Sequence, residues 1–313
     1  MIDWSTAING RYRDLPLPKL RDVLRDEHDE ELRRRGVTVE AVAAFVDRHV
    51  PIAGGAIRVR IFRPHGIEPH PAFLHLHGGG FVFGSIDSLF NDAKCAHICR
   101  RAACVVVTVD YRLAPEFRFP TAPEDCYSAL QWVVANAEKL EIDPSRIAIG
   151  GESAGGNLAA VVALMARDRG GPALALQLLE VPVTDLSDKS AAHSSVALFA
   201  EGYGLDRAEM DVFSRAYLAD PADGENPYAS PLRANDLTGV APAHVLTAEY
   251  DILRDSGEKF ARRLESAGVE TTLRRLPGHT HGSAALWQTW RPAGMWMDEV
   301  VGALLHVFTR RDA

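Results

Sequence analysis

The sequence predicts an α/β fold that is built on a mostly parallel β-sheet with right-handed crossover connections. From residue 56 onward, short apolar segments alternate with amphipathic ones, as strands and helices alternate in such folds. Several apolar segments are continuous, among them Val105–Val107, which is typical of strands covered on both faces. The chain has 313 residues, of which 47% are hydrophobic and 24% charged. It can therefore form one large domain or two smaller ones, each with a substantial core.

Strands are expected where short apolar and β-branched runs are bounded by turn residues. Helices are expected where apolar residues recur at spacings of three and four. The expected strands are Ile57–Phe62, Ala72–His77, Cys104–Val109, Arg146–Ile149, Leu174–Val181, His244–Ala248 and Thr271–Leu276, with Asp47–Ile52 as a further candidate. The expected helices between them are Leu89–Ala102, Glu124–Asn136, Leu158–Arg167, Asp255–Ala267 and Trp296–Phe308.

Two segments interrupt this alternation. Residues 1–46 lack a strand pattern and contain two amphipathic candidates for helices, Leu20–Arg35 and Val39–Asp47. Residues 186–230 also lack a strand pattern and contain an aromatic-rich helix, Arg207–Leu218.

The two strand-poor segments, 1–46 and 186–230, are expected to form a helical cap. Insertions at the C-terminal ends of strands cover the site of an open α/β sheet. The other residues, 47–185 and 231–313, then form the α/β core. The alternative is that both segments are ordinary peripheral helices.

Composition limits the partners and the location of the protein. The formal net charge of −8 argues against nucleic acid as a partner. Residues Met1–Ser5 lack the basic start of a signal peptide, and the longest apolar run is about half of a membrane span. A cytoplasmic protein without a membrane span is expected. Its cysteines are expected to be buried free thiols, because no second pair joins the first at metal-site spacing; they are Cys95, Cys99, Cys104 and Cys126.

Gly151–Gly155 fits the pattern G-x-S-x-G and lies between an expected strand and an expected helix. This context places Ser153 on a sharp turn with its hydroxyl exposed above the sheet. The glycines permit close backbone approach, and the N-terminus of the helix favours an oxyanion nearby. Ser153 is therefore the candidate nucleophile.

Donors for an oxyanion are expected in His77–Gly80, which follows a strand. Three successive glycines let backbone N–H groups face inward without side chains in the way. The residue after the nucleophile, Ala154, should supply a further N–H. The alternative is a plain glycine turn.

A serine nucleophile needs a base and an orienting acid. His279 and His281 both follow the last expected strand, and Asp251 follows the strand before it. Glu249 and Asp255 compete with Asp251, although Asp255 is better placed to serve the N-terminus of the following helix. The order serine, aspartate, histidine along the chain is that of an α/β-hydrolase.

A metal site is a weaker interpretation of the histidines. His75 and His77 share the spacing of His279 and His281, which could suggest zinc. No carboxylate-bearing zinc motif accompanies either pair, so neither a metal nor a cofactor is expected.

Taken together, these motifs resemble those of the hormone-sensitive-lipase-like esterases of the α/β-hydrolase superfamily. The resemblance covers about residues 55–310. It rests on His77–Phe81, Asp110–Glu116, Gly151–Gly156, Pro227–Pro231, Asp251–Asp255 and His281-Gly282. It implies an eight-stranded sheet with a helical cap, which agrees with the strand-poor segments.

The resemblance also implies roles for single residues. Ser153 is implied as the nucleophile, Asp251 as the acid, and His281 as the base, since the family's histidine directly precedes a glycine. Gly79 and Gly80 resemble the family's oxyanion donors, with Ala154 completing the set. Arg112 and Glu116 of the shared motifs are interpreted as a structural hydrogen-bonded corner.

The implied activity is hydrolysis of short- to medium-chain carboxylic esters, with a small ester as the partner and a homodimer through an edge strand as a possibility. The alternatives are an amidase, lactonase or deacetylase with the same triad, or a receptor without catalytic activity. Aromatic residues are candidates to line the pocket, or else belong to the core: Phe81, Phe83, Phe199, Tyr203 and Phe213, with Tyr217 and Trp287.

The chain departs from the family pattern at three positions. Glu152 stands where Asp or Thr is usual, and its carboxylate is expected to accept local hydrogen bonds. Ser283 replaces the usual Phe after His281-Gly282 and should open or polarise the space near the histidine. Ile252 replaces the usual Pro after Asp251, a mild change.

Overall fold

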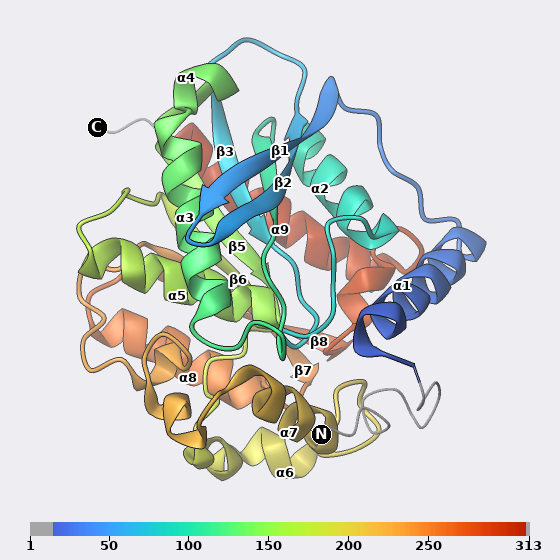
Figure 1. Ribbon diagram of the computed structural model, residues 1–313, viewed down its shortest axis with the longest axis vertical. Coiled ribbons are helices and arrows are strands. Elements are labelled where there is room, and N and C mark those ends of the chain that lie inside the picture. Colours follow the sequence, from blue (N-terminus) through green and yellow to red (C-terminus); the bar gives the residue numbers. More distant parts are fainter. Residues whose placement is uncertain (1–14, 311–313) are drawn as a thin grey trace.

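The computed structural model describes residues 15–310, which fold around one eight-stranded sheet in the order β1-β2-β4-β3-β5-β6-β7-β8 (Figure 1). The strand β2 is antiparallel to both β1 and β4, and every other neighbouring pair is parallel. The predicted mostly parallel sheet is therefore confirmed. The strands are β1 (Ala44–Ile52), β2 (Gly55–Arg63), β3 (His70–Leu76), β4 (Val105–Asp110), β5 (Ile142–Glu152), β6 (Leu176–Glu180), β7 (Ala243–Tyr250) and β8 (Thr271–Thr280).

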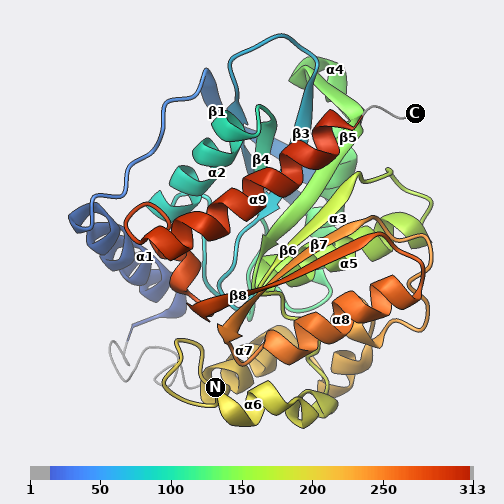
Figure 2. The ribbon, with the colours of Figure 1, turned by 180° about the vertical axis from the view of Figure 1, so that it is seen from behind.

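Helices cover both faces of the sheet. Figure 2 shows α2 and α9 across one face, and α3, α5 and α8 pack on the other. Because side chains alternate along a strand, Phe73 of β3 packs with the α2 and α9 side, whereas Leu74 packs with the α5 side. These helices are α2 (Leu89–Arg101), α3 (Thr121–Ala135), α5 (Ala154–Asp168), α8 (Arg254–Ser266) and α9 (Arg291–Thr309), with a short α4 (Ala137–Leu140) after α3.

Further helices lie over the C-terminal ends of the parallel strands. Figure 1 shows α6 and α7 at the bottom of the view and α1 at its right. The elements are α1 (Leu17–Arg34), α6 (Ser194–Leu198), α7 (Arg207–Tyr217) and the 3-10 helices η1 (Asp188–Ala192), η2 (Pro221–Glu225), η3 (Pro231–Arg233) and η4 (Ser283–Leu286). The division into cap and core stays a prediction, and residues 1–14 of the predicted cap lie outside the described residues.

One predicted helix is wrong. Val39–Asp47 was expected to be helical, but the chain has no regular structure from residue 39 to 43, and the strand β1 begins at Ala44. Apolar residues at positions 42, 45 and 46 suit a helix face, yet the residues of β1 pair with β2 in unbroken register from Ala44↔Arg63 to Ile52↔Gly55. Pairing with a neighbouring strand has overridden the local pattern.

Candidate active site

Ser153 occupies the turn between β5, which ends at Glu152, and α5, which begins at Ala154. Its φ of 56° and ψ of −116° are rarely adopted by a residue with a side chain. Its N–H donates to the Glu180 carbonyl at 2.8 Å, and its own carbonyl accepts from the N–H of Val183 at 3.2 Å. The turn is thus held by backbone hydrogen bonds to the end of β6.

Gly155 shows why the pattern around Ser153 requires small residues. A Cβ atom at this position would lie 1.9 Å from the Leu76 carbonyl oxygen at the end of β3. No side chain fits at that distance, so the close packing of the turn against β3 depends on glycine.

The structure brings Ser153, His281 and Asp251 together from three separate strand ends. The Nε2 atom of His281 lies 2.9 Å from Ser153 Oγ, and its Nδ1 lies 3.0 Å from Asp251 Oδ2. The other carboxylate oxygen of Asp251 accepts the N–H of Leu253 at 3.0 Å. Both contacts of the imidazole lie within hydrogen-bond reach, as proton transfer requires.

The electrostatics suit an imidazole that accepts a proton. Burial lowers the pKa of His281, but the Asp251 carboxylate, which is fully buried, outweighs it and raises the pKa above its usual value. An opposite charge at such a distance favours the protonated ring.

The competing residues lie elsewhere. Nδ1 of His279 is hydrogen-bonded to Ser283 Oγ at 2.8 Å, and burial lowers the pKa of this ring. Glu249 accepts the N–H of Gly278, and Asp255 accepts that of Ser195 at the start of α6. These contacts hold loops and helix ends and do not reach Ser153.

Gly79 and Gly80 lie in the loop after β3 and line the same cavity as Ser153. Gly80 has a φ of 62°, and a Cβ atom there would lie 2.6 Å from the Phe213 ring. Ala154 begins α5, and the first N–H groups of a helix have no partner within it. Of the predicted oxyanion donors, two therefore lie in the wall of this cavity and the third begins the helix that follows Ser153.

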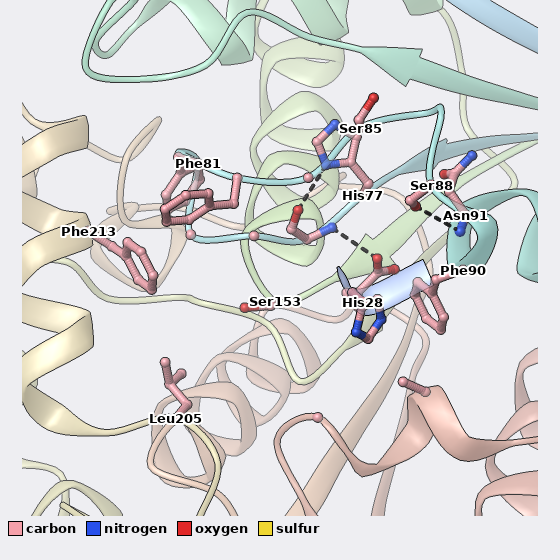
Figure 3. A pocket seen from close by; sticks show the side chains of 18 of the residues that line it. His28, His77, Phe81, Ser85, Ser88, Phe90, Asn91, Ser153, Leu205 and Phe213 are labelled. Carbon is pink, nitrogen blue, oxygen red and sulfur yellow. Dashed lines mark hydrogen bonds between the residues drawn. The ribbon is translucent and has the colours of Figure 1, made fainter. Parts of the chain in front are cut away.

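Ser153, His281, Gly79 and Gly80 line a cavity of about 750 Å³, a size typical of small-molecule sites. Figure 3 shows Ser153 between Phe81 and Phe213 on one side and His28 and Phe90 on the other. Phe83 lines the cavity as well. Side chains of α1, including His28, close part of its wall; the sequence assigned this segment to the predicted cap but did not single out His28.

The other aromatic candidates lie outside this cavity. Phe199 and Tyr203, both predicted to line the pocket, pack against each other at 5.0 Å and against Tyr250 at 6.0 Å. Tyr217 stacks behind Phe81 at 3.9 Å, and Trp287 packs against His97. The segment around residue 199 turns toward the end of β7, and its irregular spacing gave no indication of that direction.

The departures from the family pattern have clear structural consequences. Glu152 accepts hydrogen bonds from residues far away in the sequence, and not from its own turn as predicted: from Gly78 N–H at 2.9 Å, Lys94 Nζ at 2.8 Å and His75 Nε2 at 3.2 Å. The Ser283 hydroxyl is bonded to the backbone of Thr280. Small residues of this segment line the cavity beside His281, namely Gly282, Ala284 and Ala285.

Sequence reasoning missed a buried lysine next to this site. Lys94 is 2% exposed and binds Glu152 and Glu180, and Glu180 also binds Trp296. A usable signal existed, because Asn91 and Ile98 mark the buried face of α2 on which Lys94 lies. A lysine at a buried helix position requires a charged partner.

Other features of the described part of the chain bear on cofactors and location. Between residues 15 and 310, no group of three or more His, Cys, Asp or Glu side chains is placed to hold a metal ion. No helix in that range is both long enough and apolar enough to cross a membrane. The four cysteines are free and buried, as predicted. Arg112 binds Asp125 and Glu116 binds Arg21, so both make structural contacts.

Comparisons with known proteins agree with this geometry. A sequence profile of proteins with the α/β-hydrolase fold matches residues 73–285. LipN, a carboxylic ester hydrolase of Mycobacterium tuberculosis, is 40% identical over 264 residues, covering 82% of this chain and 69% of LipN. An arylesterase of Saccharolobus solfataricus is 38% identical over 277 residues, covering 88% and 87% of the two chains.

Solved structures show the same relationship. The carboxylesterase EstE1, cloned from a metagenomic library, superposes with a TM-score of 0.88 at 39% identity and covers 95% of this chain and 99% of its own. An esterase of the archaeon Pyrobaculum calidifontis gives a TM-score of 0.87 at 37% identity, covering 94% of each chain. The chain therefore belongs to the α/β-hydrolase family, among the esterases similar to hormone-sensitive lipase.

Proposed function

We propose that this protein hydrolyses carboxylic esters with Ser153 as the nucleophile, His281 as the general base and Asp251 as the orienting acid. The hydrogen-bonded series Ser153–His281–Asp251, with contacts of 2.9 and 3.0 Å, carries the proposal. The relatives that are named as ester hydrolases support an ester as the substrate.

The chemistry follows from the direction of these contacts. His281 Nε2 takes the proton of Ser153 as Oγ attacks the carbonyl carbon, and the same nitrogen then protonates the departing alcohol. Water next gives a proton to His281 Nε2 as its oxygen attacks the acyl carbon. When the bond to Ser153 Oγ breaks, His281 returns that proton to Oγ, which releases the acid and restores Ser153. Asp251 holds Nδ1–H, so that Nε2 faces the serine, and stabilises the imidazolium.

The oxyanion formed in both steps would be bound by the backbone N–H groups of Gly79, Gly80 and Ala154. One such donor is typically worth about 3 kcal/mol in the transition state. The positive φ values of Ser153 and Gly80 support this assignment, as does the place of Gly79 and Gly80 in the wall of the cavity that contains Ser153.

Short- to medium-chain acyl esters suit the cavity best. Apolar side chains of Phe81, Phe213 and Leu205 line one side of Ser153, in a cavity of about 750 Å³, which is the size of a small-molecule site. Because this side of the cavity is mainly apolar, it favours an aliphatic or aromatic acyl group.

Covalent labelling of the nucleophile tests this proposal. A p-nitrophenyl phosphonate should label Ser153, as mass spectrometry of the digested protein would show, and Ser153→Ala should abolish both labelling and hydrolysis of p-nitrophenyl butyrate. Labelling at another residue, or turnover retained by Ser153→Ala, would refute the proposal. A series of p-nitrophenyl esters from acetate to palmitate then tests the acyl length, with kcat/KM expected to be highest below about ten carbons.

A further inference from the structure

Two glutamates end neighbouring strands directly beside the nucleophile. Glu152 is the last residue of β5, Glu180 is the last residue of β6, and the two are register partners. Two carboxylates in this position repel each other. Each is followed by a residue with positive φ, namely Ser153 at 56° and Val181 at 39°. Both strand ends are thus like-charged and sharply bent.

Lys94 of α2 lies between these two carboxylates. Its Nζ donates to Glu152 Oε2 at 2.8 Å and to Glu180 Oε1 at 2.7 Å. The side chain of Lys94 is 2% exposed, and an ammonium is removed from water at high cost unless it is paired. The second oxygen of Glu180 accepts Trp296 Nε1–H from α9 at 2.7 Å. The cluster therefore joins both strand ends to the helices behind them.

The same two glutamates bind the nucleophile turn and the oxyanion loop, whose distance from each other must stay fixed during catalysis. The backbone carbonyl of Glu180 accepts the N–H of Ser153 at 2.8 Å. The Oε1 atom of Glu152 accepts the N–H of Gly78 at 2.9 Å, the residue before the predicted oxyanion donors. One ammonium thus connects the nucleophile turn with the oxyanion loop.

We propose that Lys94 is a positioning residue of this esterase, whose ammonium fixes the oxyanion loop relative to Ser153 by binding Glu152 and Glu180. This inference rests on the function proposed above. An active-site group that is misplaced by about 1 Å can cost about 100-fold in rate. Lys94, Glu152 and Glu180 also lie in the wall of the cavity, but a clamp at the strand ends acts chiefly on kcat, because it fixes the geometry of the reacting groups.

The charge of Lys94 also keeps Glu152 ionised. Burial raises the pKa of Glu152, but Lys94 and then His75 outweigh burial and hold it well below its usual value. The other ionisable groups that interact with Glu152 are His77, Tyr111 and His281, and Glu180 faces the same ammonium.

Removal of Lys94 should make the site sensitive to acid. Without the ammonium, the pKa of Glu152 rises because burial and Glu180 both disfavour its charge. A protonated Glu152 is a weaker acceptor for Gly78 N–H, so the oxyanion loop loosens as the pH falls. In a plot of kcat against pH, the acid limb is the part in which kcat rises with pH. This limb should therefore move to higher pH.

Lys94→Met tests this with p-nitrophenyl butyrate. We expect kcat to fall about 10- to 100-fold, KM to change less than about threefold, and the acid limb to move upward. Lys139→Met is the matched control, because Lys139 is exposed on the short helix α4. Phosphonate titration counts the active sites, so that unfolded protein does not count as a loss of rate.

A second substitution separates positioning from simple stability. In Lys94→Met/Glu152→Gln the amide oxygen still accepts from Gly78 but does not titrate, so the acid limb should return to its wild-type position while kcat stays low. If Lys94→Met does not fold, Lys94→Gln serves instead, because its amide still donates to one carboxylate.

The inference would be overturned if the Lys94 variant kept the wild-type kcat and an unmoved acid limb. It would also be overturned if a lower melting temperature were the only effect. Ser153→Ala is measured alongside. If it remains active, the proposed function fails; if it is inactive while the Lys94 variant behaves as wild type, only the role of Lys94 fails.

Discussion

Arg21 of α1 donates to both carboxylate oxygens of Glu116, at 2.9 and 2.7 Å, and so joins the helix over the cavity to the loop after β4. The same guanidinium donates to the carbonyls of Val82 at 2.7 Å and Ala114 at 2.6 Å. Such planar, multidentate contacts suit arginine better than lysine. Arg21 thereby fixes α1 against the loop that carries the predicted oxyanion donors.

Arg21→Met should weaken substrate binding more than it slows the chemical step. Loss of the contacts lets α1 move away from the cavity that it helps to close, and we expect KM for p-nitrophenyl butyrate to rise about tenfold, or about 1.4 kcal/mol. Arg34→Met is the control, since within residues 15–310 Arg34 pairs with the exposed Glu30 and Glu31 of its own helix. An unchanged KM with a lower kcat would place the effect of Arg21 on the oxyanion loop instead.

His281→Ala should reduce kcat by about four orders of magnitude or more, because its Nε2 is the nitrogen in hydrogen-bond contact with Ser153 Oγ and would take the proton. His279→Ala should cost far less activity, since that ring packs at 5.0 and 5.2 Å against Trp290 and Trp296. Its effect should appear as a lower melting temperature. Steady-state kinetics of both variants decide the matter, and a larger kcat loss in His279→Ala would exchange their roles.

Asp251→Asn should lower activity and move its pH dependence. The base must be neutral, so activity appears as the pH rises through the pKa of His281. Burial lowers this pKa and Asp251 raises it to a net value above the usual one. Removal of the carboxylate charge leaves burial opposed by the weaker effects of Glu209 and Glu152, so the acid limb should shift to lower pH while the plateau falls about 10⁴-fold. A limb that stays in place or moves upward would contradict the electrostatic role of Asp251.

The nucleophile turn could be predicted from the sequence because its requirements are local. The glycine at 155 is needed for contact with Leu76, and the strand and helix on either side of Ser153 show their own periodicity. The strands could be predicted for the same reason, since continuous apolar runs are typical of strands with two covered faces. The first residues of β1 were the exception, because their helical pattern gave way to pairing with β2, whereas the rest of β1 coincides with the candidate strand Asp47–Ile52.

The partners of buried charges could not be predicted in this way. Lys94 binds residues that lie 58 and 86 positions away in the sequence. No periodicity connects such positions; only the fold does. The direction in which Phe199 and Tyr203 point could not be predicted either, because an irregular segment has no repeating face.

Asp185→Asn should destabilise the segment that leads into α6. The Asp185 carboxylate is fully buried and accepts hydrogen bonds from Ser187 Oγ at 2.7 Å and from His193 and Arg233. Burial raises its pKa, but the three donors outweigh burial and lower the pKa well below the usual value. Loss of one partner of a buried ion pair typically costs about 3–5 kcal/mol.

The pH dependence of that cost has a definite sign. A carboxylate with a lowered folded-state pKa contributes stability above its unfolded pKa, about 3.9, and loses it as the pH falls toward the folded value. The difference in unfolding free energy between wild type and Asp185→Asn should therefore be largest near pH 7 and shrink below about pH 4. Urea unfolding across this range measures it, with exposed Asp188→Asn as the control. A constant difference would mean that packing, and not charge, is lost.

Gly80→Ala should impair the oxyanion loop through two separable effects. The new Cβ would lie 2.6 Å from the Phe213 ring, and a φ of 62° is strained for alanine. We expect kcat to fall about 10- to 100-fold, as for loss of an oxyanion donor at the lower end of the usual range.

The double variant Gly80→Ala/Phe213→Ala distinguishes the two causes. Phe213→Ala removes the steric contact but leaves the backbone strain, so kcat should recover only in part relative to Gly80→Ala. Phe213→Ala alone should chiefly raise KM, because the ring lines the cavity. Full recovery in the double variant would show that the left-handed backbone is tolerated and that the ring alone displaces the N–H groups. No recovery would show that the φ of Gly80 aims them at the oxyanion, since the strain persists whether or not the ring is present.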